Sequence, residues 1–341
     1  MSSTVTLTAT RPRISVAAGP TATKSTALED ALAIAKEHRS RDTVKSLLTI
    51  TANYATIGLA IAMSEVMAPH FIENKLAMVL VRAVAVLAIS SRLRGFENLV
   101  HEASHNNLFA SPQTHAMLEA LYAFPVFRIV CDYRASHLVH HKHLGDPEKD
   151  PDIIRLHELG LHNIRDAPIY YLAGVPASGY LVYEYFTTTF ADFWTSKSVR
   201  VSKSLYWATV LGLVTWTDSW SFFALYYVVP LFCVLSTTRY WAEASEHVGM
   251  DLNSSFATSR NNLGFLHRWF QHPHNDGYHA VHHLHAQVPF HKLPVVHELL
   301  TNQNPEYKST TVESQGMWET FCQMATSKTI VKGRPTTGDW S

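Results

Sequence analysis

The sequence has little cysteine and little charge. Its 341 residues include only three cysteines, Cys131, Cys233 and Cys322, and these form no C-x-x-C pair. That number excludes a disulfide framework and a cysteine-rich metal site. Charged residues make up 16% of the chain and the formal net charge is zero, whereas soluble domains carry about 25% charged residues. This composition gives no reason to expect a nucleic acid partner and suits a protein with apolar membrane segments.

The first 25 residues also lack the features of a targeting segment. They contain no continuous apolar run, so a secretory signal peptide is not expected. They are rich in Ser, Thr, Ala and Val, and no acidic residue precedes Glu29. This composition favours a disordered tail over an organelle transit peptide.

Histidine, in contrast, is abundant and clustered. Of 21 histidines, seven lie between His101 and His143 and ten between His247 and His297. Three short motifs repeat the same spacing: His101-Glu102-Ala103-Ser104-His105, His137-Leu138-Val139-His140-His141 and His279-Ala280-Val281-His282-His283. On a helix, residues at i, i+3 and i+4 share one face. Because neutral imidazole is a common ligand of transition metals, these eight histidines predict a site for two ions.

Four apolar stretches predict two membrane hairpins. An even number of spans returns the chain to its starting side, and Arg41, Lys45, Arg92 and Arg94 make that side cytoplasmic by the positive-inside rule. The sequence therefore predicts an all-α bundle of about four spanning helices. The four stretches are Leu47–Met67, Leu76–Ile89, Leu205–Trp216 and Trp220–Leu235. Thr114–Val130 fits an interfacial or re-entrant segment, and Pro168–Phe186 fits either an interface segment or a span.

The second and fourth stretches are expected to continue beyond the membrane as helices. His101 lies 12 residues after Ile89, or about 18 Å along a helix, although Gly95 could bend that helix. All three motifs then lie in one cytoplasmic histidine-rich cap. The predicted domains are a polar tail at 1–43 with a short helix at about 27–38, a membrane metal-binding domain at 44–300, and a polar tail at 301–341 with one helix near 312–324.

Two metal chemistries compete for these motifs. His101-Glu102-Ala103-Ser104-His105 reads H-E-x-x-H, the zinc protease signature, in which Glu102 would act as the general base. However, a zinc protease needs one further ligand and has no use for two H-x-x-H-H motifs. Inert structural zinc closes with four ligands. Eight or nine histidines agree better with two irons that hold four or five ligands each.

Taken together, the three motifs and the apolar hairpins resemble the membrane-bound fatty acid desaturase superfamily over roughly residues 45–300. Further similarities are Asp150-Pro151-Asp152 after the second motif, Glu246-His247 after the last predicted span, and Val288-Pro289-Phe290-His291 after the third motif. The first motif, followed by Asn107-Leu108-Phe109, looks most like the dihydrorhizobitoxine desaturase branch. That branch includes enzymes of small amino-acid-derived molecules, so the substrate is either a fatty-acyl or a small lipid-like or amino-acid-derived compound.

The resemblance implies an oxygen-dependent enzyme with two Fe²⁺ ions. Dioxygen and two external electrons would remove hydrogen from an unactivated C–H bond. Loss of a neighbouring hydrogen would give a double bond, whereas oxygen transfer would give an alcohol, so a hydroxylase remains an alternative. The chain lacks the His-Pro-Gly-Gly of a fused cytochrome b5, so a separate ferredoxin or cytochrome b5 would be the donor. The implied iron ligands are His101, His105, His137, His140, His141, His247, His279, His282 and His283.

Other polar residues near the motifs receive supporting roles. His143, His272, His274 and His285 are interpreted as neighbours of the ligands or as surface residues. Acidic residues could orient the ligand imidazoles; these are Glu102, Glu243, Glu246, Asp146, Asp150 and Asp152. Arg134 and Arg239 could pair with those acids or guide a substrate carboxylate, with pairing favoured.

Overall fold

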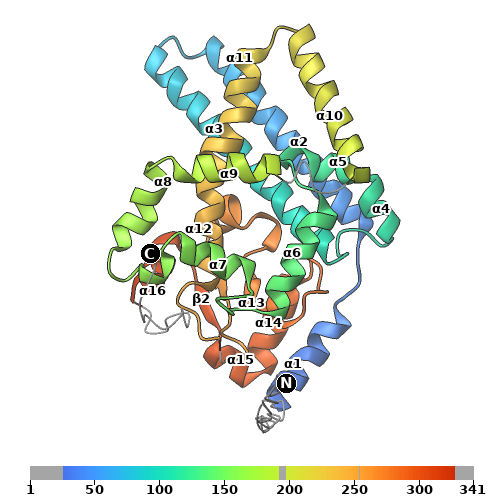
Figure 1. The fold of residues 1–341 in the computed structure, drawn as a ribbon, viewed down its shortest axis with the longest axis vertical. Coiled ribbons are helices and arrows are strands. Elements are labelled where there is room, and N and C mark those ends of the chain that lie inside the picture. The colour runs from blue at the N-terminus through green and yellow to red at the C-terminus, as the bar shows by residue number, and fades with distance from the viewer. Residues whose placement is uncertain (1–25, 192–196, 253, 327–341) are drawn as a thin grey trace, which may run out of the picture.

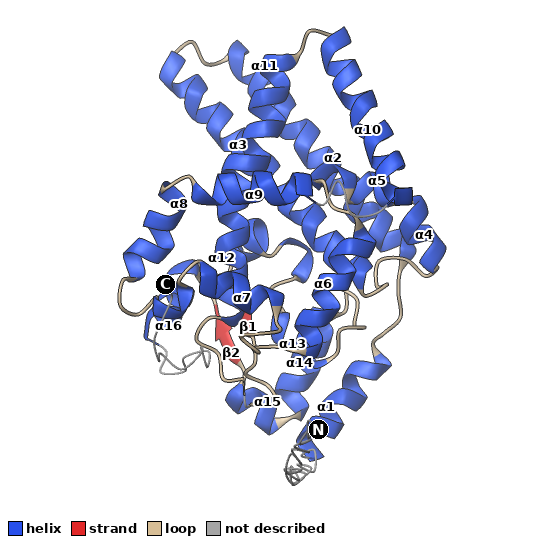
Figure 2. Ribbon diagram, in the orientation of Figure 1, coloured by secondary structure: helices blue, strands red, loops and turns tan. Residues whose placement is uncertain are grey.

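The computed structural model describes residues 26–191, 197–252 and 254–326, and this part of the chain is mostly helical (Figures 1 and 2). In these ranges the strands are β1 (Arg260–Asn262) and β2 (Val312–Ser314), which pair in parallel with Asn261 opposite Glu313. The helical character agrees with the predicted fold class. The predicted disordered tail, residues 1–25, lies outside the described residues.

Three helices are long and apolar enough to cross a membrane. They run over Thr43–His70, Lys75–Ser104 and Trp220–His247. The first comprises α2 (Thr43–Ala62) and two short turns, the second is α3 (Lys75–Ser104), and the third joins α11 (Trp220–Phe223), a π-helical segment (Ala224–Leu235) and α12 (Ser236–His247). These helices contain three of the four predicted spans and carry them beyond the predicted ends, as expected for the second and fourth.

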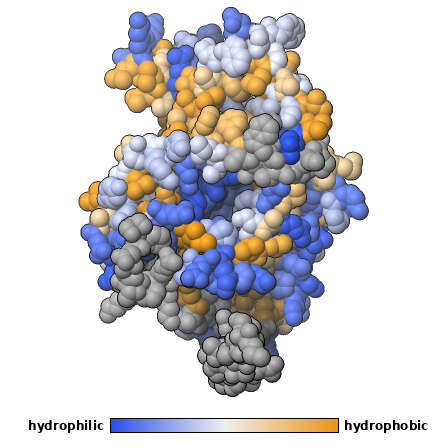
Figure 3. Space-filling view, in the orientation of Figure 1, coloured by the Kyte–Doolittle hydropathy of each residue, from blue (hydrophilic) through white to orange (hydrophobic). Residues whose placement is uncertain are grey.

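The fourth predicted span, Leu205–Trp216, lies in α10 (Lys197–Trp216). Helix α10 stands beside the other three (Figure 1) but is not among the described helices that are both long and apolar enough to cross a membrane. Large apolar side chains are exposed on these helices, including Leu59 on α2, Leu80 and Val84 on α3, and Leu205 on α10. In Figure 3 apolar residues gather over this half of the molecule, whereas the other half is mainly hydrophilic. This is the surface expected of membrane helices.

Two segments near the base of the long helices consist of short pieces. The interval predicted to be interfacial forms α4 (Pro112–Met117), α5 (Glu119–Tyr122) and a 3₁₀ turn (Phe124–Val126). The interval left open between interface and span contains a π-helical turn (Tyr170–Gly174), α8 (Val175–Ala177) and α9 (Tyr180–Ala191), with Gly179 at φ +77° between the last two. Neither interval forms a helix of spanning length.

The remaining helices build the cap below the long helices. They are α1 (Thr26–Glu37), α6 (Val130–Lys142), α7 (Pro151–Glu158), α13 (His279–Leu284), α14 (Leu293–Gln303), α15 (Pro305–Thr310) and α16 (Met317–Thr326). The short helix predicted at about 27–38 corresponds to α1. The helix predicted near 312–324 corresponds only in part to α16, because its first three residues form β2 and α16 begins at Met317. Both β2 and α16 pack into the cap, because β2 pairs with β1 and α16 contacts α12.

Helix α3 connects the membrane half to the cap without a break. Its lower part is buried, with Leu93, Phe96 and Leu99 in the core. Gly95 does not end the helix; instead, it leaves room for His274, since a Cβ atom at Gly95 would lie 2.7 Å from His274 Nε2. The helix therefore brings the first histidine motif directly under the membrane helices.

A polar cluster joins the three candidate spans near their far end. Arg82 on α3 donates from Nε and Nη2 to the Glu65 carboxylate, at 2.8 and 3.1 Å. The Tyr226 hydroxyl also bonds Glu65, and it lies 2.8 Å from the Ser64 hydroxyl. Lipid cannot form hydrogen bonds with charged side chains, so in an apolar setting this bidentate ion pair supplies the hydrogen bonds that both groups need.

Breaking this pair should destabilise the bundle. We expect Arg82→Ala to lower the thermal midpoint of the purified protein, because Glu65 loses its charged partner. In a double-mutant cycle with Glu65→Ala, the effects of the two substitutions on stability should not be additive. Additive effects of the two substitutions would show that the pair contributes no stability.

Candidate metal centre

All nine predicted histidine ligands converge in the cap. They come from four helices: α3 and the residue that follows it supply His101 and His105, α6 supplies His137, His140 and His141, the end of α12 supplies His247, and α13 supplies His279, His282 and His283. Seven of the nine are buried, and His141 and His283 are half-buried. They divide into two adjacent groups, with the rings of His141 and His283 only 4.5 Å apart.

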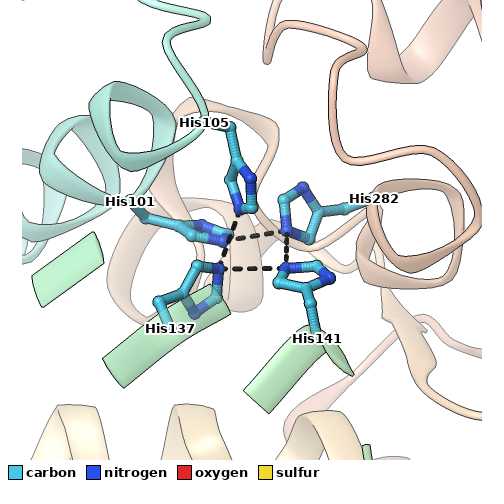
Figure 4. Close-up of side chains that lie close together, drawn as sticks. All are labelled: His101, His105, His137, His141 and His282. Atoms are coloured by element: carbon cyan, nitrogen blue, oxygen red, sulfur yellow. Dashed lines mark hydrogen bonds between the residues drawn. The ribbon is translucent and has the colours of Figure 1, made fainter. Parts of the chain in front are cut away.

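The first group contains five histidines whose ring nitrogens all lie within 4.8 Å of one another: His101, His105, His137, His141 and His282 (Figure 4). Their Nε2 atoms form a continuous chain of contacts. His101 to His282 and His105 to His137 are 2.9 Å, and His141 lies 3.0 Å from both His137 and His282. Five imidazoles from three separate helices therefore point at one position.

Hydrogen bonds alone do not explain this arrangement. Each Nε2 carries either one proton or one lone pair, so four successive Nε2 contacts cannot all be ordinary hydrogen bonds. A cation at their centre would satisfy every lone pair at once. Two imidazole ligands at right angles, each about 2.1 Å from an ion, lie about 3.0 Å apart. The observed separations therefore fit ligands that surround a transition metal.

The second group contains four histidines. His140, His247 and His283 place their ligand atoms within 4.8 Å of one another. His279 Nε2 lies 3.2 Å from His247 Nε2 and 3.1 Å from His283 Nε2, and His140 Nε2 is 3.3 Å from His283 Nε2. Glu246 Oε2 is 3.7 Å from His279 Nε2, so a carboxylate oxygen is also available to this group.

The H-x-x-H-H spacing distributes ligands between both groups. In the second motif His137 and His141 enter the first group, whereas His140 enters the second. The third motif does the reverse, because His282 joins the first group while His279 and His283 contact the second. Residues four apart on a helix lie one above the other, and a residue between them is displaced around the axis. Each of these two motifs therefore contributes ligands to both histidine groups.

Carboxylates fix several of the ligand rings. Asp276 Oδ1 lies 2.9 Å from His101 Nδ1, and Asp150 Oδ1 lies 2.8 Å from His140 Nδ1. A bond at Nδ1 holds the ring and leaves Nε2 as the free ligand atom. Although burial raises the pKa of Asp276, hydrogen bonds from His101 and His272 hold it well below its ordinary value, so this carboxylate is charged.

Asp150 has a second task at the start of α7. Its side chain accepts from Asp152 N at 3.0 Å and from Gly145 N at 2.8 Å. Asp150, in the acidic loop after the second motif, is therefore the N-cap of α7, and it also orients His140. Asp152 lies 3.5 Å from the same His140 Nδ1.

Backbone contacts position α12 and α13. The buried Arg260 donates to the carbonyl oxygens of Ser245 and Val248, on either side of His247. Asn261 accepts from Ala280 N at 2.9 Å and so caps the start of α13. The short strand β1 therefore fixes the ends of α12 and α13, two of the three helices that carry ligands to the second group.

The protonation states suit metal binding. Burial lowers the pKa of His141 to about 2 and holds that of His105, His137 and His282 well below the ordinary range, so these rings are neutral. For His140, burial opposes protonation, but the charges of Asp152 and Asp150 raise its pKa to about 9. A metal ion at the second group would therefore displace a proton from His140.

A cavity of about 210 Å³ adjoins the two groups. Three helices line it, each with residues at helical spacing on one face. Helix α3 contributes Arg94, Glu97, Asn98 and His101; α6 contributes Asp132, Tyr133, Ser136, His137 and His140; and α12 contributes Arg239, Glu243, Glu246 and His247. Arg128, Asp152, Asp276 and His279 complete the polar lining. The arrangement leaves room for a small molecule beside the imidazoles.

The neighbouring histidines are outside both groups, as interpreted from the sequence. His272 Nδ1 contacts Glu246 at 3.3 Å and Asp276 at 3.4 Å, and His274 Nε2 lies 3.1 Å from Asn53 Oδ1. His143 and His285 are half-buried. His272 therefore supports two carboxylates that in turn contact His101 and His279.

The proposed acidic and basic partners divide into two kinds. Asp150, Asp152 and Glu246 contact ligand histidines, whereas Asp146 bonds Glu148 N and Lys149 within its own loop. Arg239 pairs with Glu243 at 2.6 Å, which is the pairing favoured from the sequence. Arg134 does not line the cavity.

Glu102 does not occupy the position of a protease base. Its carboxylate is buried and accepts from Phe290 N at 2.8 Å, and it is not part of the cavity lining. Glu102 therefore connects α3, through this hydrogen bond, to the segment after the third motif. The histidines on either side of Glu102 belong to a five-histidine group, which exceeds the ligand number of a zinc protease.

Sequence reasoning identified Arg239 but missed Asp276, Arg94 and Arg128 as residues of the site. Asp276 precedes His279 by three residues and follows His272 by four, and this spacing was the available signal. Arg94 and Arg128 lie far apart in sequence and meet only through tertiary packing around Glu97.

Removing the charge of Asp276 should weaken metal binding at the first group. We expect Asp276→Asn to lower iron affinity about 10- to 100-fold, because the ligand His101 loses its carboxylate partner. Iron retained after dialysis against graded chelator measures this. The matched control is Asp146→Asn, in a loop carboxylate that contacts no ligand. Equal retention in both variants would contradict the role of Asp276.

Comparison with known proteins agrees with this geometry. The sequence profile of the fatty acid desaturase family matches residues 76–314, which include all nine histidines. Dihydrorhizobitoxine desaturase from Bradyrhizobium elkanii is 27% identical over 253 residues, which cover 69% of this chain and 72% of that protein. Because the family profile spans well over half of the sequence, the chain belongs to the fatty acid desaturase family.

Proposed function

We propose that this protein is an oxygen-dependent di-iron desaturase of a membrane. Its family and its desaturase relative make it an oxidoreductase. The observation that carries the di-iron proposal is the division of nine histidines into two adjacent groups, each converging through Nε2 atoms. Five and four imidazoles are a donor set suited to iron.

Two ferrous ions, when bound, would supply the reduction of dioxygen and the removal of hydrogen from an unactivated C–H bond. The overall balance needs four electrons for one dioxygen. Two come with the two hydrogens lost by the substrate as its double bond forms, and two come from a separate donor of the ferredoxin or cytochrome b5 type. Together with two protons they yield two waters.

The residues of the chain perform the remaining tasks. Asp276 and Asp150 orient the rings of His101 and His140, and burial keeps most of the ligands away from water. The cavity lined by α3, α6 and α12 would hold the substrate beside His101, His137, His140, His247 and His279. Such positioning of a C–H bond and exclusion of water are the contributions expected of the protein.

The proposed orientation in the membrane follows from the charges at the helix ends. Arg92 and Arg94 lie on α3 between its membrane part and His101. By the positive-inside rule this end is cytoplasmic, so the histidine cap would face the cytoplasm in a multi-pass protein. Helices α1, α13, α14 and α15 of the cap lie at the end of the molecule opposite the tips of the long helices (Figure 1).

The experiment is to measure iron content and reaction products. We expect about two irons per chain and, with dioxygen and a reductant, an alkene product. We also expect His140→Ala to lose the iron of the second group and the activity, because His140 supplies one of its four imidazoles. Membrane insertion should be retained in this variant.

His143→Ala is the matched control, because His143 lies near His140 in sequence but in neither group. Full activity or unchanged iron content in His140→Ala would contradict the site assignment. An alcohol as the product would contradict the desaturase proposal and leave the di-iron centre in place.

A further inference from the structure

Helix α9 exposes aromatic side chains on the face that points away from the protein. Leu181, Tyr185 and Thr189, which are spaced four residues apart, are buried and form the inner face. On a helix at the surface of a soluble protein, the opposite face carries charged and polar side chains. The aromatic residues on this face of α9, which are between 41% and 65% exposed, are Tyr180, Tyr183, Phe186 and Phe190. The outer face of α9 is therefore suited to a medium less polar than water.

The charged group and the threonines of α9 are bonded within the protein. Glu184 is the one charged residue of this helix, and its two oxygens accept from Arg155 at 2.6 and 2.7 Å. Thr187 donates to the carbonyl oxygen of Tyr183 at 3.0 Å, and Thr188 donates to that of Glu184 at 2.9 Å. Hydroxyls on α2 and α10 bond their own helices in the same way. Helix α9 therefore presents no unpaired charge to its surroundings, which is a requirement for contact with lipid.

Helix α9 lies at the level where the lipid-exposed part of the long helices ends. The last exposed large apolar side chain is Leu87 on α3 and Val229 on the third candidate span. Phe186 of α9 contacts Phe232, which follows Val229 on that span, and the two ring centroids are 5.4 Å apart. In Figure 1 α9 runs across the direction of the long helices, at their junction with the cap. This is the position of a helix that lies in the plane of a membrane surface.

A second segment marks the same level. The Tyr54 hydroxyl of α2 donates to the carbonyl oxygen of Leu121 in α5 at 2.8 Å. The segment formed by α4 and α5 exposes Met117 and Leu121. Figure 1 shows α5 to the right of α9 and at a similar height. Two segments that are separate in sequence therefore expose apolar side chains in one plane across the molecule.

The inner face of α9 is attached to the walls of the cavity. The Tyr185 hydroxyl donates to Glu97 Oε1 at 3.1 Å, and Glu97 lines the cavity beside the histidine groups. Arg155, the partner of Glu184, also pairs with Glu243 of the same lining. The helix therefore contacts the cavity walls on one face and exposes aromatic rings on the other.

We propose that the exposed face of α9 binds the surface of the lipid bilayer on the side of the cap, with its aromatic rings where headgroups meet acyl chains. Aromatic side chains are enriched at this level of a membrane, because their rings are apolar and a tyrosine hydroxyl can reach water. The partner is lipid, since Phe186 continues the lipid-exposed surface of the third candidate span through Phe232. The cavity consequently lies directly below the membrane surface, with α9 between the two.

Spin labels on α9 test this contact in the full chain reconstituted in nanodiscs. The native cysteines, Cys131, Cys233 and Cys322, are first replaced by serine. A nitroxide is then attached to Tyr183→Cys or to Phe186→Cys. We expect each label to collide more often with dissolved oxygen, which partitions into lipid, than with a water-soluble nickel chelate. Power-saturation electron paramagnetic resonance measures both collision rates.

Two control positions calibrate this measurement. Leu87→Cys reports on the lipid-exposed part of α3, and Glu158→Cys reports on an exposed position of α7 in the cap. The labels on α9 should resemble the label at Leu87→Cys. If they collide with the nickel chelate as often as the label at Glu158→Cys, α9 faces water and the proposal fails. Labels that collide with neither reagent would show that protein covers this face, which would also overturn the proposal.

A charged substitution gives a second test. An aspartate that contacts lipid loses its water, so Tyr183→Asp should lower the thermal midpoint of the protein in nanodiscs. Tyr183→Trp, which keeps an aromatic ring at the interface, should leave the midpoint unchanged. The matched control is Val295→Asp on α14 of the cap, because Val295 is also an exposed apolar residue in the first turn of its helix. An equal loss of stability in the two aspartate variants would contradict the contact with lipid.

Discussion

The cap depends on one electrostatic constraint, the convergence of nine imidazole nitrogens in a buried space. Rings that point their Nε2 lone pairs at one another from 2.9–3.3 Å repel unless a cation or a shared proton lies between them. Asp150, Asp152, Asp276 and Glu246 stand close to these rings. These negative charges favour a bound cation between the rings. Metal binding and packing of the cap are therefore expected to be coupled.

This constraint explains why the ligands lie on helices that enter the cap from different directions. A single H-x-x-H-H helix presents a pair of rings four residues apart and a third ring turned away from them. On α6 and α13 the paired and the single rings face opposite groups. The two helices therefore link the two histidine groups, while α3 and α12 each complete one group. Distances within the centre depend on all four helices at once.

The sequence revealed those parts of the site that depend on local spacing. The nine histidines, Asp150 and the extension of α3 and α12 beyond the membrane followed from motifs and helical periodicity. The cavity did not, because Arg94, Arg128, Arg239 and Glu97 come together only when α3, α12 and the segment before α6 pack. Asp276 was missed for the same reason, since its partner His101 lies 175 residues away. The fourth span also stays a prediction, because α10 is less apolar than the other three.

The charge distribution gives the cavity two different walls. Asp150, Asp152, Asp276 and Glu246 lie against the ligand imidazoles. On the other wall, Arg94 and Arg128 lie close to Glu97, and Arg239 pairs with Glu243. Because the carboxylates of this second wall have arginine partners, only the wall beside the imidazoles would need bound cations to balance its charge.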